Sequence, residues 1–335
     1  MINKVLIVVW DNLGDCIMAT DILKPLKRLF PHVKVGFWVK KYVADAFFDE
    51  PLIDTVHAAD LFWDWAPGQK RGAIVPFLRT QREVAQEGYD VALILNTEWR
   101  RSLACFLAKI PRRIGYNRRK AKPFLTESLN LPQETVARFE LHYRLLSLLG
   151  LKEQCKDADL PHIQSSAEAR KSALAWITKK GWADKILIAV HPFSGDPLKC
   201  WSIANWFKLV DRIKNMNSHC RFIFIGSKEE IASLYFHTPP LDQIVCQPFV
   251  GSLKEVKGVL SSCHLFIGGD SGPGHLAGAL RVPVICLFGP TDPLVYAPRG
   301  ETRISVIKQK AMIDISISQV ADQAASFLSE VVTRK

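Results

Sequence analysis

The chain of 335 residues lacks an apolar run long enough to cross a bilayer, which takes about 20 residues. Its opening apolar run, Val5–Val9, is too short for the core of a signal peptide, and Asp11 and Asp15 follow it at once. These absences argue against an integral membrane protein and against a secreted one. We therefore expect the protein to remain in the cytoplasm.

Cysteine pairs at redox or metal-binding spacing are also missing. The eight cysteines are scattered, and no Cys-x-x-Cys pair occurs among them. Several lie inside apolar runs, where a reduced cysteine behaves as a small hydrophobic residue. We interpret them as buried thiols in a reducing compartment, and not as a disulfide framework or a zinc site. The chain shows neither an internal repeat nor a low-complexity segment.

Acidic residues are absent from one long segment. Between Trp99 and Thr126 the chain carries nine basic residues and no acidic one, within a net charge of +11. Such a segment predicts an anionic partner: a nucleic acid, an anionic membrane surface or a phosphorylated substrate. The alternative is a solvated surface with some internal ion pairs.

What the chain does contain is an α/β pattern, in which short apolar strands alternate with helices on both sides of a polar segment, Lys152–Ser166. A hydrophobic fraction of 48% and a charged fraction of 23% are typical of a globular protein, and the length suffices for two domains. We predict domains at residues 1–155 and 183–316, joined by a linker and helix at 156–182. A terminal helix is predicted within 317–335.

A glycine-rich turn links two of the predicted strands. The strand Leu265–Ile267 ends at Gly268-Gly269, where Asp270 and Ser271 suit the start of a helix and Pro273 its first turn. The uncapped N–H groups at such a helix start favour a bound anion, typically a phosphate. A second strand, Val282–Phe288, ends in another Gly-Pro turn, and two such turns are typical of a nucleotide crevice.

The same segment resembles glycosyltransferase family 9, the heptosyltransferases that build the inner core of lipopolysaccharide. The match runs through Asp270-Ser-Gly-Pro, His275-Leu-Ala and Phe288-Gly-Pro-Thr-Asp-Pro293. One departure is Gly274, where the family usually carries a larger residue. The resemblance implies the GT-B architecture: two doubly wound Rossmann-like domains that face each other across a cleft, with residues 317–335 crossing back to the N-terminal domain.

The carboxylates that follow the first strand are candidates for acid–base chemistry. Asp11-Asn-Leu-Gly-Asp15 lies between the first strand and the first helix, at the carboxyl end of a parallel strand. The resemblance assigns the catalytic base to Asp15, which would take the proton from an acceptor hydroxyl. The alternative for Asp15 is a helix N-cap. Asp11 is a weaker second candidate for the base.

A second loop, His191–Trp201, resembles the nucleotide loop of the family, in which a lysine precedes a tryptophan. The match makes Lys199 the contact for the diphosphate, and the alternative is an unpaired surface lysine. Ser194 could donate a hydrogen bond to a phosphate oxygen. A positioned ammonium and helix N–H groups can stabilise a departing diphosphate without a metal. We expect no metal and no cofactor, because the sequence shows no dense carboxylate cluster.

The remaining donor-site residues follow from the same resemblance. Asp270 would accept hydrogen bonds from the donor sugar, and the helix beginning at Ser271 and Gly272 would face the phosphates. His275 is expected to pack or hydrogen-bond inside the site. Glu229, or its neighbour Glu230, is placed to bind a ribose hydroxyl, although both would serve equally well as solvated carboxylates.

The basic segment would meet the acceptor. The stretch Arg113-Ile-Gly-Tyr-Asn-Arg-Arg119 reads as in the family, and Arg and Lys suit the phosphates of an anionic acceptor. The resemblance gives this role to four residues: Arg113, Arg118, Arg119 and Lys120. Trp63 and Trp65 could contact a membrane interface or a sugar ring, or pack their loop against the domain.

Together these features predict an inverting glycosyltransferase that is metal-independent and peripherally associated with the inner membrane. The donor implied is ADP-heptose, and the acceptor a lipopolysaccharide core intermediate. Three alternatives remain: a related transferase with another nucleotide-sugar or acceptor, a protein that binds nucleic acid or another anionic polymer, and an inactive donor-binding scaffold. The nucleic-acid alternative leaves both nucleotide loops without a role.

Overall fold

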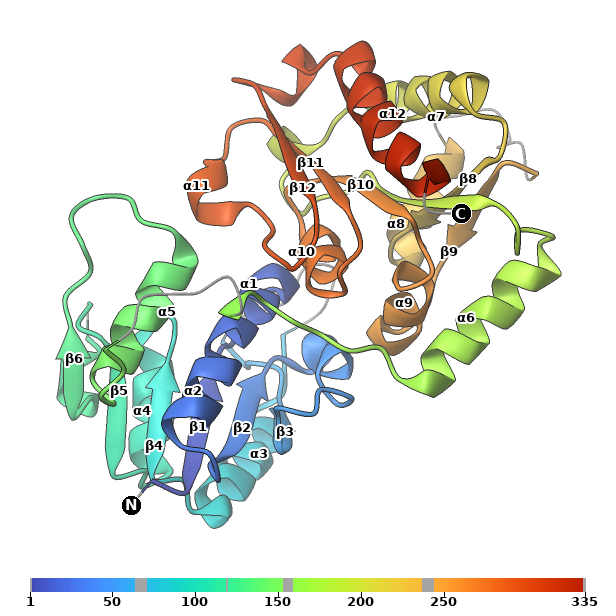
Figure 1. Cartoon of the computed structure of the whole chain (residues 1–335). Coiled ribbons are helices and arrows are strands. Elements are labelled where there is room, and N and C mark those ends of the chain that lie inside the picture. Colours follow the sequence, from blue (N-terminus) through green and yellow to red (C-terminus); the bar gives the residue numbers. More distant parts are fainter. Residues whose placement is uncertain (1, 64–70, 119, 153–158, 237–243, 334–335) are drawn as a thin grey trace. The chain divides into compact units, whose positions relative to one another are not determined.

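The computed structural model describes residues 2–63, 71–118, 120–152, 159–236 and 244–333. The chain divides into two compact units, unit 1 at residues 1–163 and unit 2 at residues 164–335. The division falls inside the segment 156–182 that the sequence marks as a linker and helix. Each unit is an α/β structure, as Figure 1 shows.

Unit 1 is built on a parallel sheet with strand order β3-β2-β1-β4-β5-β6. Its strands are β1 (Lys4–Val8), β2 (Lys34–Val39), β3 (Thr55–Ala58), β4 (Val91–Ile94), β5 (Arg112–Tyr116) and β6 (Glu127–Leu129). The α-helices are α1 (Leu13–Met18), α2 (Leu23–Leu29), α3 (Ile74–Glu87), α4 (Trp99–Leu107) and α5 (Arg138–Ser147). Short 3-10 helices include η1 (Ala19–Ile22), η2 (Lys41–Ala46) and η3 (Lys122–Phe124).

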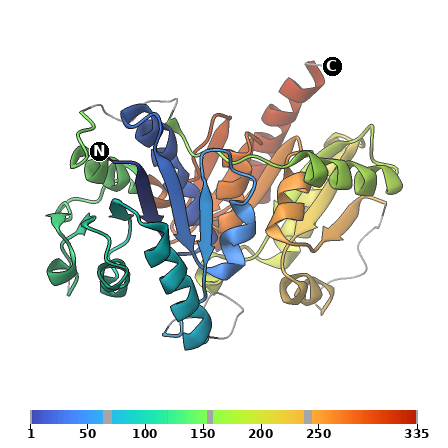
Figure 2. The same ribbon diagram turned by 90° about the horizontal axis from the view of Figure 1, so that it is seen from below.

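Helices cover both faces of this sheet. Figure 2 shows α3 on the opposite side of the sheet from α1 and α2. Because both faces are buried, the central strands are apolar throughout and do not alternate with polar residues. One face of β1 and β4 packs on α3 and α4 through Leu6, Val8, Ala92, Ile94, Phe77, Val84, Ala104 and Cys105.

Unit 2 repeats the architecture, with strand order β12-β11-β10-β7-β8-β9 and parallel pairing throughout. Its strands are β7 (Ile186–His191), β8 (Cys220–Ile225), β9 (Cys246–Phe249), β10 (Leu265–Gly269), β11 (Val284–Phe288) and β12 (Ile304–Lys308). The α-helices are α6 (Ala167–Lys179), α7 (Ile203–Met216), α8 (Lys228–Phe236), α9 (Leu253–Leu260), α10 (Gly272–Ala279), α11 (Pro293–Tyr296) and α12 (Ile317–Thr333). The 3-10 helices of unit 2 include η5 (Pro197–Lys199) and η6 (Met312–Asp314).

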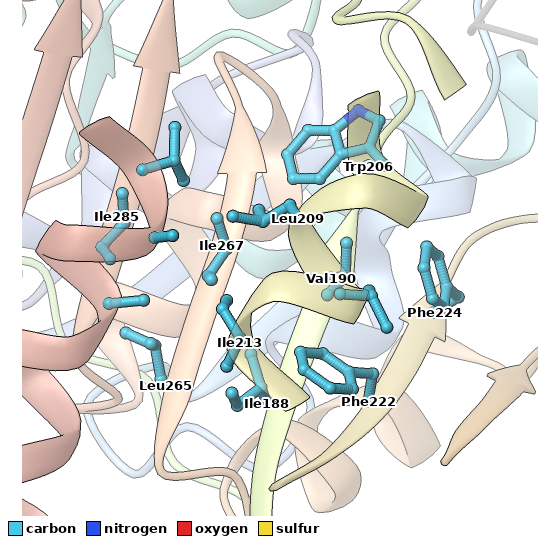
Figure 3. Close-up of a cluster of buried hydrophobic side chains, with 14 of the residues drawn as sticks. Ile188, Val190, Trp206, Leu209, Ile213, Phe222, Phe224, Leu265, Ile267 and Ile285 are labelled. Atoms are coloured by element: carbon cyan, nitrogen blue, oxygen red, sulfur yellow. The ribbon is translucent and has the colours of Figure 1, made fainter. Parts of the chain in front are cut away.

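The core of unit 2 lies between its sheet and helix α7. Figure 3 shows Trp206, Leu209 and Ile213 of α7 over the side chains of β7, β8 and β10. Trp206 is 1% exposed and Ile213 equally so, which makes α7 the helix that closes this face. The amphipathic face of α7 begins after Ser202, whose hydroxyl accepts a hydrogen bond from the N–H of Asn205 as an N-cap.

Glycines follow two helical segments of the chain. Gly150 and Gly181 both have positive φ, 99° and 71°, which is a backbone region that L side chains rarely adopt. The helical region that follows β1 is divided into α1, η1 and α2. A proline inside a helix removes one backbone donor, and Pro25 lies near the start of α2.

Helix α12 packs within unit 2. Its buried residues Val320, Ala321 and Phe327 belong to the same core as α7. The family resemblance implies that the tail at 317–335 crosses back to the N-terminal domain, and this stays a prediction. The buried face of α12 completes the core of unit 2. The physical reason is the apolar stripe of the helix, which covers the sheet face left open beside α7. The two doubly wound units themselves are those that the sequence predicts.

We expect the substitution Gly268→Ala to destabilise unit 2 by about 1–3 kcal/mol, the usual cost of overpacking a core. A Cβ at Gly268 would lie 2.7 Å from the ring of Phe266 and 3.1 Å from the carbonyl oxygen of His191. Chemical denaturation measures the change in the free energy of unfolding. Gly195→Ala is the matched control, because a Cβ there meets nothing within 4 Å. Equal stability of the two variants would contradict this packing argument.

Candidate functional site

The first cluster of polar side chains lies in unit 1, where β1 and β4 end side by side. Asp11 follows β1 and Asn96 follows β4, and the amide nitrogen of Asn96 lies 2.6 and 2.7 Å from the two carboxylate oxygens of Asp11. The chain leaves β1 toward β2 on one side and leaves β4 toward β5 on the other side, so the two connections run in opposite directions along the sheet. Such a reversal of strand order leaves a crevice at the carboxyl ends of parallel strands. The two residues therefore meet at the place where an α/β unit binds its ligands.

Arg101 of α4 completes this cluster. Its Nη1 lies 2.7 Å from Oδ2 of Asp11, and its Nη2 lies 2.9 Å from Oδ1 and 2.8 Å from the carbonyl oxygen of Trp10. Burial opposes ionisation of Asp11, but Arg101 and Asn96 outweigh it, so the pKa of Asp11 is lowered. Both oxygens of this carboxylate are occupied, which excludes Asp11 as a base.

Asp15 lies in the third position of α1 and is less tightly held. The N-cap of this helix is Asn12, whose side-chain oxygen accepts a hydrogen bond of 3.1 Å from the hydroxyl of Tyr42. The alternative in which Asp15 serves as the cap is therefore wrong. The carboxylate of Asp15 forms an ion pair of 3.5 Å with Arg138. Its oxygens thus remain suited to accept a proton.

The charges around Asp15 decide how basic it is. Burial and the negative charge of Asp11 raise the pKa of Asp15, while Arg138, His142 and Arg101 oppose them, and the net shift is upward. Both Arg138 and His142 come from α5. A carboxylate of raised pKa in a strand-end crevice is a candidate general base.

Sequence reasoning missed the partners on α5. His142 is buried and its Nδ1 lies 3.1 Å from Oδ1 of Asp21, which is buried as well. Together with Arg138 this pair fixes α5 beside the short helix η1. No local motif marks these residues, since Asp21 and His142 are 121 positions apart.

The second cluster lies at the corresponding place in unit 2, where β7 and β10 are neighbours. The ammonium of Lys199, in η5 after β7, lies 2.7 Å from Oδ2 of Asp270, which follows β10. The hydroxyl of Thr291 donates to the same oxygen at 2.9 Å. Thr291 lies in the Gly-Pro-Thr-Asp-Pro turn, for which no separate role of Thr291 is predicted from the sequence. The cluster brings three loops together at one sheet edge.

Helix α10 begins beside this cluster. Ser271 is its N-cap residue and Gly272 its first residue, and no side chain caps the helix. The hydroxyl of Ser271 donates instead to the carbonyl oxygen of Gly269 at 3.3 Å. Pro273 has no N–H, and the N–H of Gly274 donates to the carbonyl oxygen of Ser271 at 3.2 Å. The N–H of Gly272 is therefore the first-turn donor left to an anion or to solvent.

His275 lies inside α10 and is 4% exposed. Burial lowers the pKa of His275 to about 4, with a smaller contribution from the charge of Lys199. The imidazole is therefore neutral near pH 7, and it hydrogen-bonds the backbone of Tyr296. This environment agrees with a residue that packs inside the site.

The other predicted donor-site residues are less well placed. Ser194 is half-buried, and its hydroxyl oxygen accepts the N–H of Asp196 at 3.3 Å. Glu230 is the partner of Ser227 in a capping box at the start of α8, with hydrogen bonds of 2.8 and 3.1 Å. Glu229 is fully exposed, and hydrogen bonds from its own backbone and from Ser227 lower its pKa. These contacts explain both glutamates as helix-start residues.

Much of the basic segment is used inside unit 1. Arg112 forms a two-point ion pair with Glu127 at 2.8 and 3.0 Å, and Arg101 is bound to Asp11. Arg113 donates to the carbonyl oxygens of Phe124, Ile110 and Pro111, so the role predicted for it at the acceptor is not supported by its contacts.

Part of this segment is left for a partner, since Lys109 and Lys122 are exposed. Arg118 and Lys120 are exposed, while Arg119 lies outside the described residues. Trp63 packs on Trp10 and Phe77, with ring centroids 5.8 and 5.0 Å apart, and Trp65 is also outside the described part of the chain. Of the nine basic residues, a binding surface for a long anionic polymer therefore loses four to partners inside unit 1: Arg100, Arg101, Arg112 and Arg113.

Among the described residues, no cluster of three or more His, Cys, Asp or Glu side chains could hold a metal ion. Asp159 of the triplet Asp157-Ala-Asp159 is buried and paired with Arg28, with Nη2 2.8 Å from Oδ2. The described cysteines are all free thiols. Among the helices that the structure describes, none is both long and apolar enough to span a bilayer.

A cavity of about 340 Å³ in unit 2 lies apart from both clusters. It is found between α7 and α12 and carries no ionisable side chain. The lining residues are Ile213, Met216, Asn217, Ala321, Ala325, Leu328 and Ser329. A lining of this kind offers no group for acid–base or phosphate chemistry.

Comparison with known proteins identifies one family of glycosyltransferases. A family model described as glycosyltransferase family 9 (heptosyltransferase) matches residues 77–324. Lipopolysaccharide heptosyltransferase 3 of Escherichia coli K12 is 22% identical over 308 residues, which cover 87% of this chain and 84% of that protein.

Two solved structures share the fold. The family 9 glycosyltransferase of Veillonella parvula has a TM-score of 0.83 at 22% identity, covering 98% of this chain and 97% of that one. The ADP-heptose lipopolysaccharide heptosyltransferase II of E. coli has a TM-score of 0.79 at 17% identity, with 98% and 99% covered. Both units therefore follow the GT-B fold that the sequence predicts.

We expect Arg113→Ala to lower the free energy of unfolding by about 1–3 kcal/mol, because it leaves carbonyl groups of unit 1 without their donor. Arg118→Ala, an exposed neighbour, should change it by less than about 0.5 kcal/mol. Thermal and chemical unfolding of the two variants measure the difference. An Arg113→Ala variant as stable as Arg118→Ala would return Arg113 to the acceptor surface.

Proposed function

The chain belongs to glycosyltransferase family 9, and we propose that it transfers heptose from ADP-heptose to an inner-core lipopolysaccharide acceptor. A solved relative named as an ADP-heptose lipopolysaccharide heptosyltransferase supports this donor. The observation on which the proposal chiefly rests is the environment of Asp15. One carboxylate, Asp11, is saturated by Arg101 and Asn96, while the other is kept basic beside it.

At the acceptor end, Asp15 would act as the general base. As the acceptor hydroxyl oxygen attacks the anomeric carbon, its proton passes to a carboxylate oxygen of Asp15. The bond between the anomeric carbon and the diphosphate oxygen breaks on the opposite face, so the configuration inverts. A raised pKa makes Asp15 a better proton acceptor than an ordinary aspartate.

At the donor end, Lys199 and the first turn of α10 would meet the diphosphate. The leaving ADP gains negative charge as the glycosidic bond breaks, and a fixed ammonium with aligned N–H groups stabilises that charge. Asp270 holds Lys199 at 2.7 Å and remains an acceptor for sugar hydroxyls. Ser194 lies in the same loop and would add a hydroxyl donor. We propose that this stabilisation operates without a metal ion.

The acceptor and the location of the enzyme belong to the same proposal. Lipopolysaccharide precursors carry phosphates, and the exposed side chains of Arg118 and Lys120 suit them. Arg119 would join them by its position in the sequence. We propose that the protein works in the cytoplasm at the inner-membrane surface, where such acceptors are anchored.

Nucleotide binding tests the donor assignment. We expect isothermal titration to give tighter binding for ADP than for UDP, GDP or NAD, with no loss on adding EDTA. Lys199→Ala should weaken ADP binding by about 10- to 100-fold, the value of a charge-assisted hydrogen bond. Lys254→Ala is the control, because Lys254 also pairs with a carboxylate in unit 2 but is exposed. A preference for UDP or GDP would overturn the donor assignment.

Turnover tests the role of Asp15. We expect Asp15→Asn to lower kcat by about 10²- to 10⁴-fold, because the amide cannot take the proton, and to leave ADP binding unchanged. In the parent enzyme, kcat should fall as the pH drops through the raised pKa of Asp15, since only the ionised form is a base. Initial rates with ADP-heptose and truncated lipopolysaccharides measure both effects.

The control for this substitution is Asp45→Asn, an exposed aspartate in η2 of the same unit. Asp45→Asn should keep the parent rate and pH profile. If Asp15→Asn also retained the parent rate, the catalytic base would have to be sought elsewhere.

A further inference from the structure

We propose that Asp11 and Arg101 are positioning residues for Asp15: their buried ion pair fixes the turn that carries Asp15 and keeps a negative charge beside it. This inference rests on the proposed role of Asp15 as the base. Neither Asp11 nor Arg101 is given a proton-transfer step of its own.

The hydrogen bonds of Asp11 show why it can hold the turn. Oδ1 receives Asn96 Nδ2 at 2.6 Å and Arg101 Nη2 at 2.9 Å, while Oδ2 receives the same amide at 2.7 Å and Arg101 Nη1 at 2.7 Å. Both oxygens are thus bound from two sides. A carboxylate held in this way has little freedom to rotate and serves as an anchor.

Arg101 ties the anchor to the end of β1. Its side chain is 5% exposed, and Nη2 also donates to the carbonyl oxygen of Trp10, the residue just before Asp11. Asn96 is fixed in turn, because its side-chain oxygen accepts the N–H groups of Thr97 and Glu98 ahead of α4. The β1–α1 turn is therefore attached to β4 and α4, the neighbouring strand and helix of the sheet.

The helix that carries Asp15 leaves directly from this anchor. The N–H of Cys16 donates to the carbonyl oxygen of Asn12 at 3.1 Å, and the thiol of Cys16 reaches the carbonyl oxygens of Val9 and Asp11 at 3.3 and 3.6 Å. The turn and the first turn of α1 are thereby one connected piece. A shift of Asp11 would move Asp15 with it.

Charge is the second part of the argument. The charged groups that face Asp15 are Asp11 in the turn, Arg101 of α4, and Arg138 and His142 of α5. Asp11 raises the pKa of Asp15 by more than Arg101 lowers it, so the ion pair presents its negative end to the base. His142 is itself bound to Asp21.

Two further groups near Asp15 are uncharged at neutral pH. Burial raises the pKa of Cys16 and that of Tyr42, which contacts the N-cap of α1 from η2. They therefore contribute no charge to the environment of the base. The ionisation of Asp15 is set by its burial, by the charge of Asp11 and by the three side chains Arg138, His142 and Arg101 around it.

The test uses the pH dependence of kcat for Asp11→Asn. This substitution keeps the shape of the side chain but removes its charge and leaves Arg101 with a neutral partner. Both changes favour the ionised form of Asp15, so the acid limb of the kcat profile should move about one unit to lower pH. The rate on the plateau should also fall, because the base is weaker. ADP binding should be unchanged.

A second variant, Arg101→Lys, tests the geometric part. Lysine keeps the charge but cannot bind both oxygens of Asp11 and the carbonyl of Trp10 at once. We expect kcat to fall by about 10- to 100-fold, because Asp15 is misplaced. The acid limb of the pH profile of kcat and the KM for the donor should stay unchanged. This variant keeps the proposal testable if Asp11→Asn fails to fold.

The matched control is Arg112→Gln, which breaks another two-point ion pair of unit 1, with Glu127. It should leave the acid limb and KM as in the parent. An Asp11→Asn enzyme with the parent pH profile, or an Arg101→Lys enzyme with the parent kcat, would overturn the proposal. If the positioning proposal fails in this way but Asp15→Asn is inactive in the same assays, the role of Asp15 as the base still stands. An active Asp15→Asn would instead overturn the proposed function.

Discussion

The reversal of strand order in each sheet is the constraint on which both clusters depend. In unit 1 the chain leaves β1 toward β2 and later enters β4 on the other side of β1. In unit 2 the same reversal occurs between the neighbouring strands β7 and β10, because the chain leaves β7 toward β8 and leaves β10 toward β11. Connections that diverge from neighbouring strands leave the strand ends uncovered, and polar side chains can gather there without being buried under a helix. Asp11 with Asn96, and Lys199 with Asp270, span these two positions.

The sequence predicted the elements that are apolar or end at a glycine. The strands at β1, β7, β10 and β11 are runs of Val, Ile, Leu and Phe, buried on both faces, so their hydrophobicity alone identifies them. Strand β5 was missed because it begins with Arg112 and Arg113, which are read as surface residues. The structure places both guanidinium groups on partners in the same unit, a tertiary effect that no local pattern reveals.

The site was predictable one partner at a time. Asp15, Lys199 and Asp270 stand in motifs that combine a strand end with a helix start, and such motifs can be read from the sequence. Their partners cannot, because the contacts join residues 71, 85 and 90 positions apart. The sequence therefore indicates which carboxylates matter, but not that Asp11 is neutralised by Arg101 while Asp15 is left basic. That difference follows only from the packing of α4 and α5 around α1.

Lys199 carries its own counter-ion, and this has a consequence for which anions it can hold. An anion that approaches the ammonium must compete with the carboxylate of Asp270, which lies 2.7 Å away and is supported by Thr291. A monovalent ion such as chloride or acetate offers nothing that Asp270 does not already supply. A diphosphate brings a higher charge and several oxygens, and it can engage the ammonium and the N–H groups of α10 together. If Lys199 holds the diphosphate as proposed, the ion pair sets a threshold of valence, so that the site selects by charge before any sugar or base is recognised.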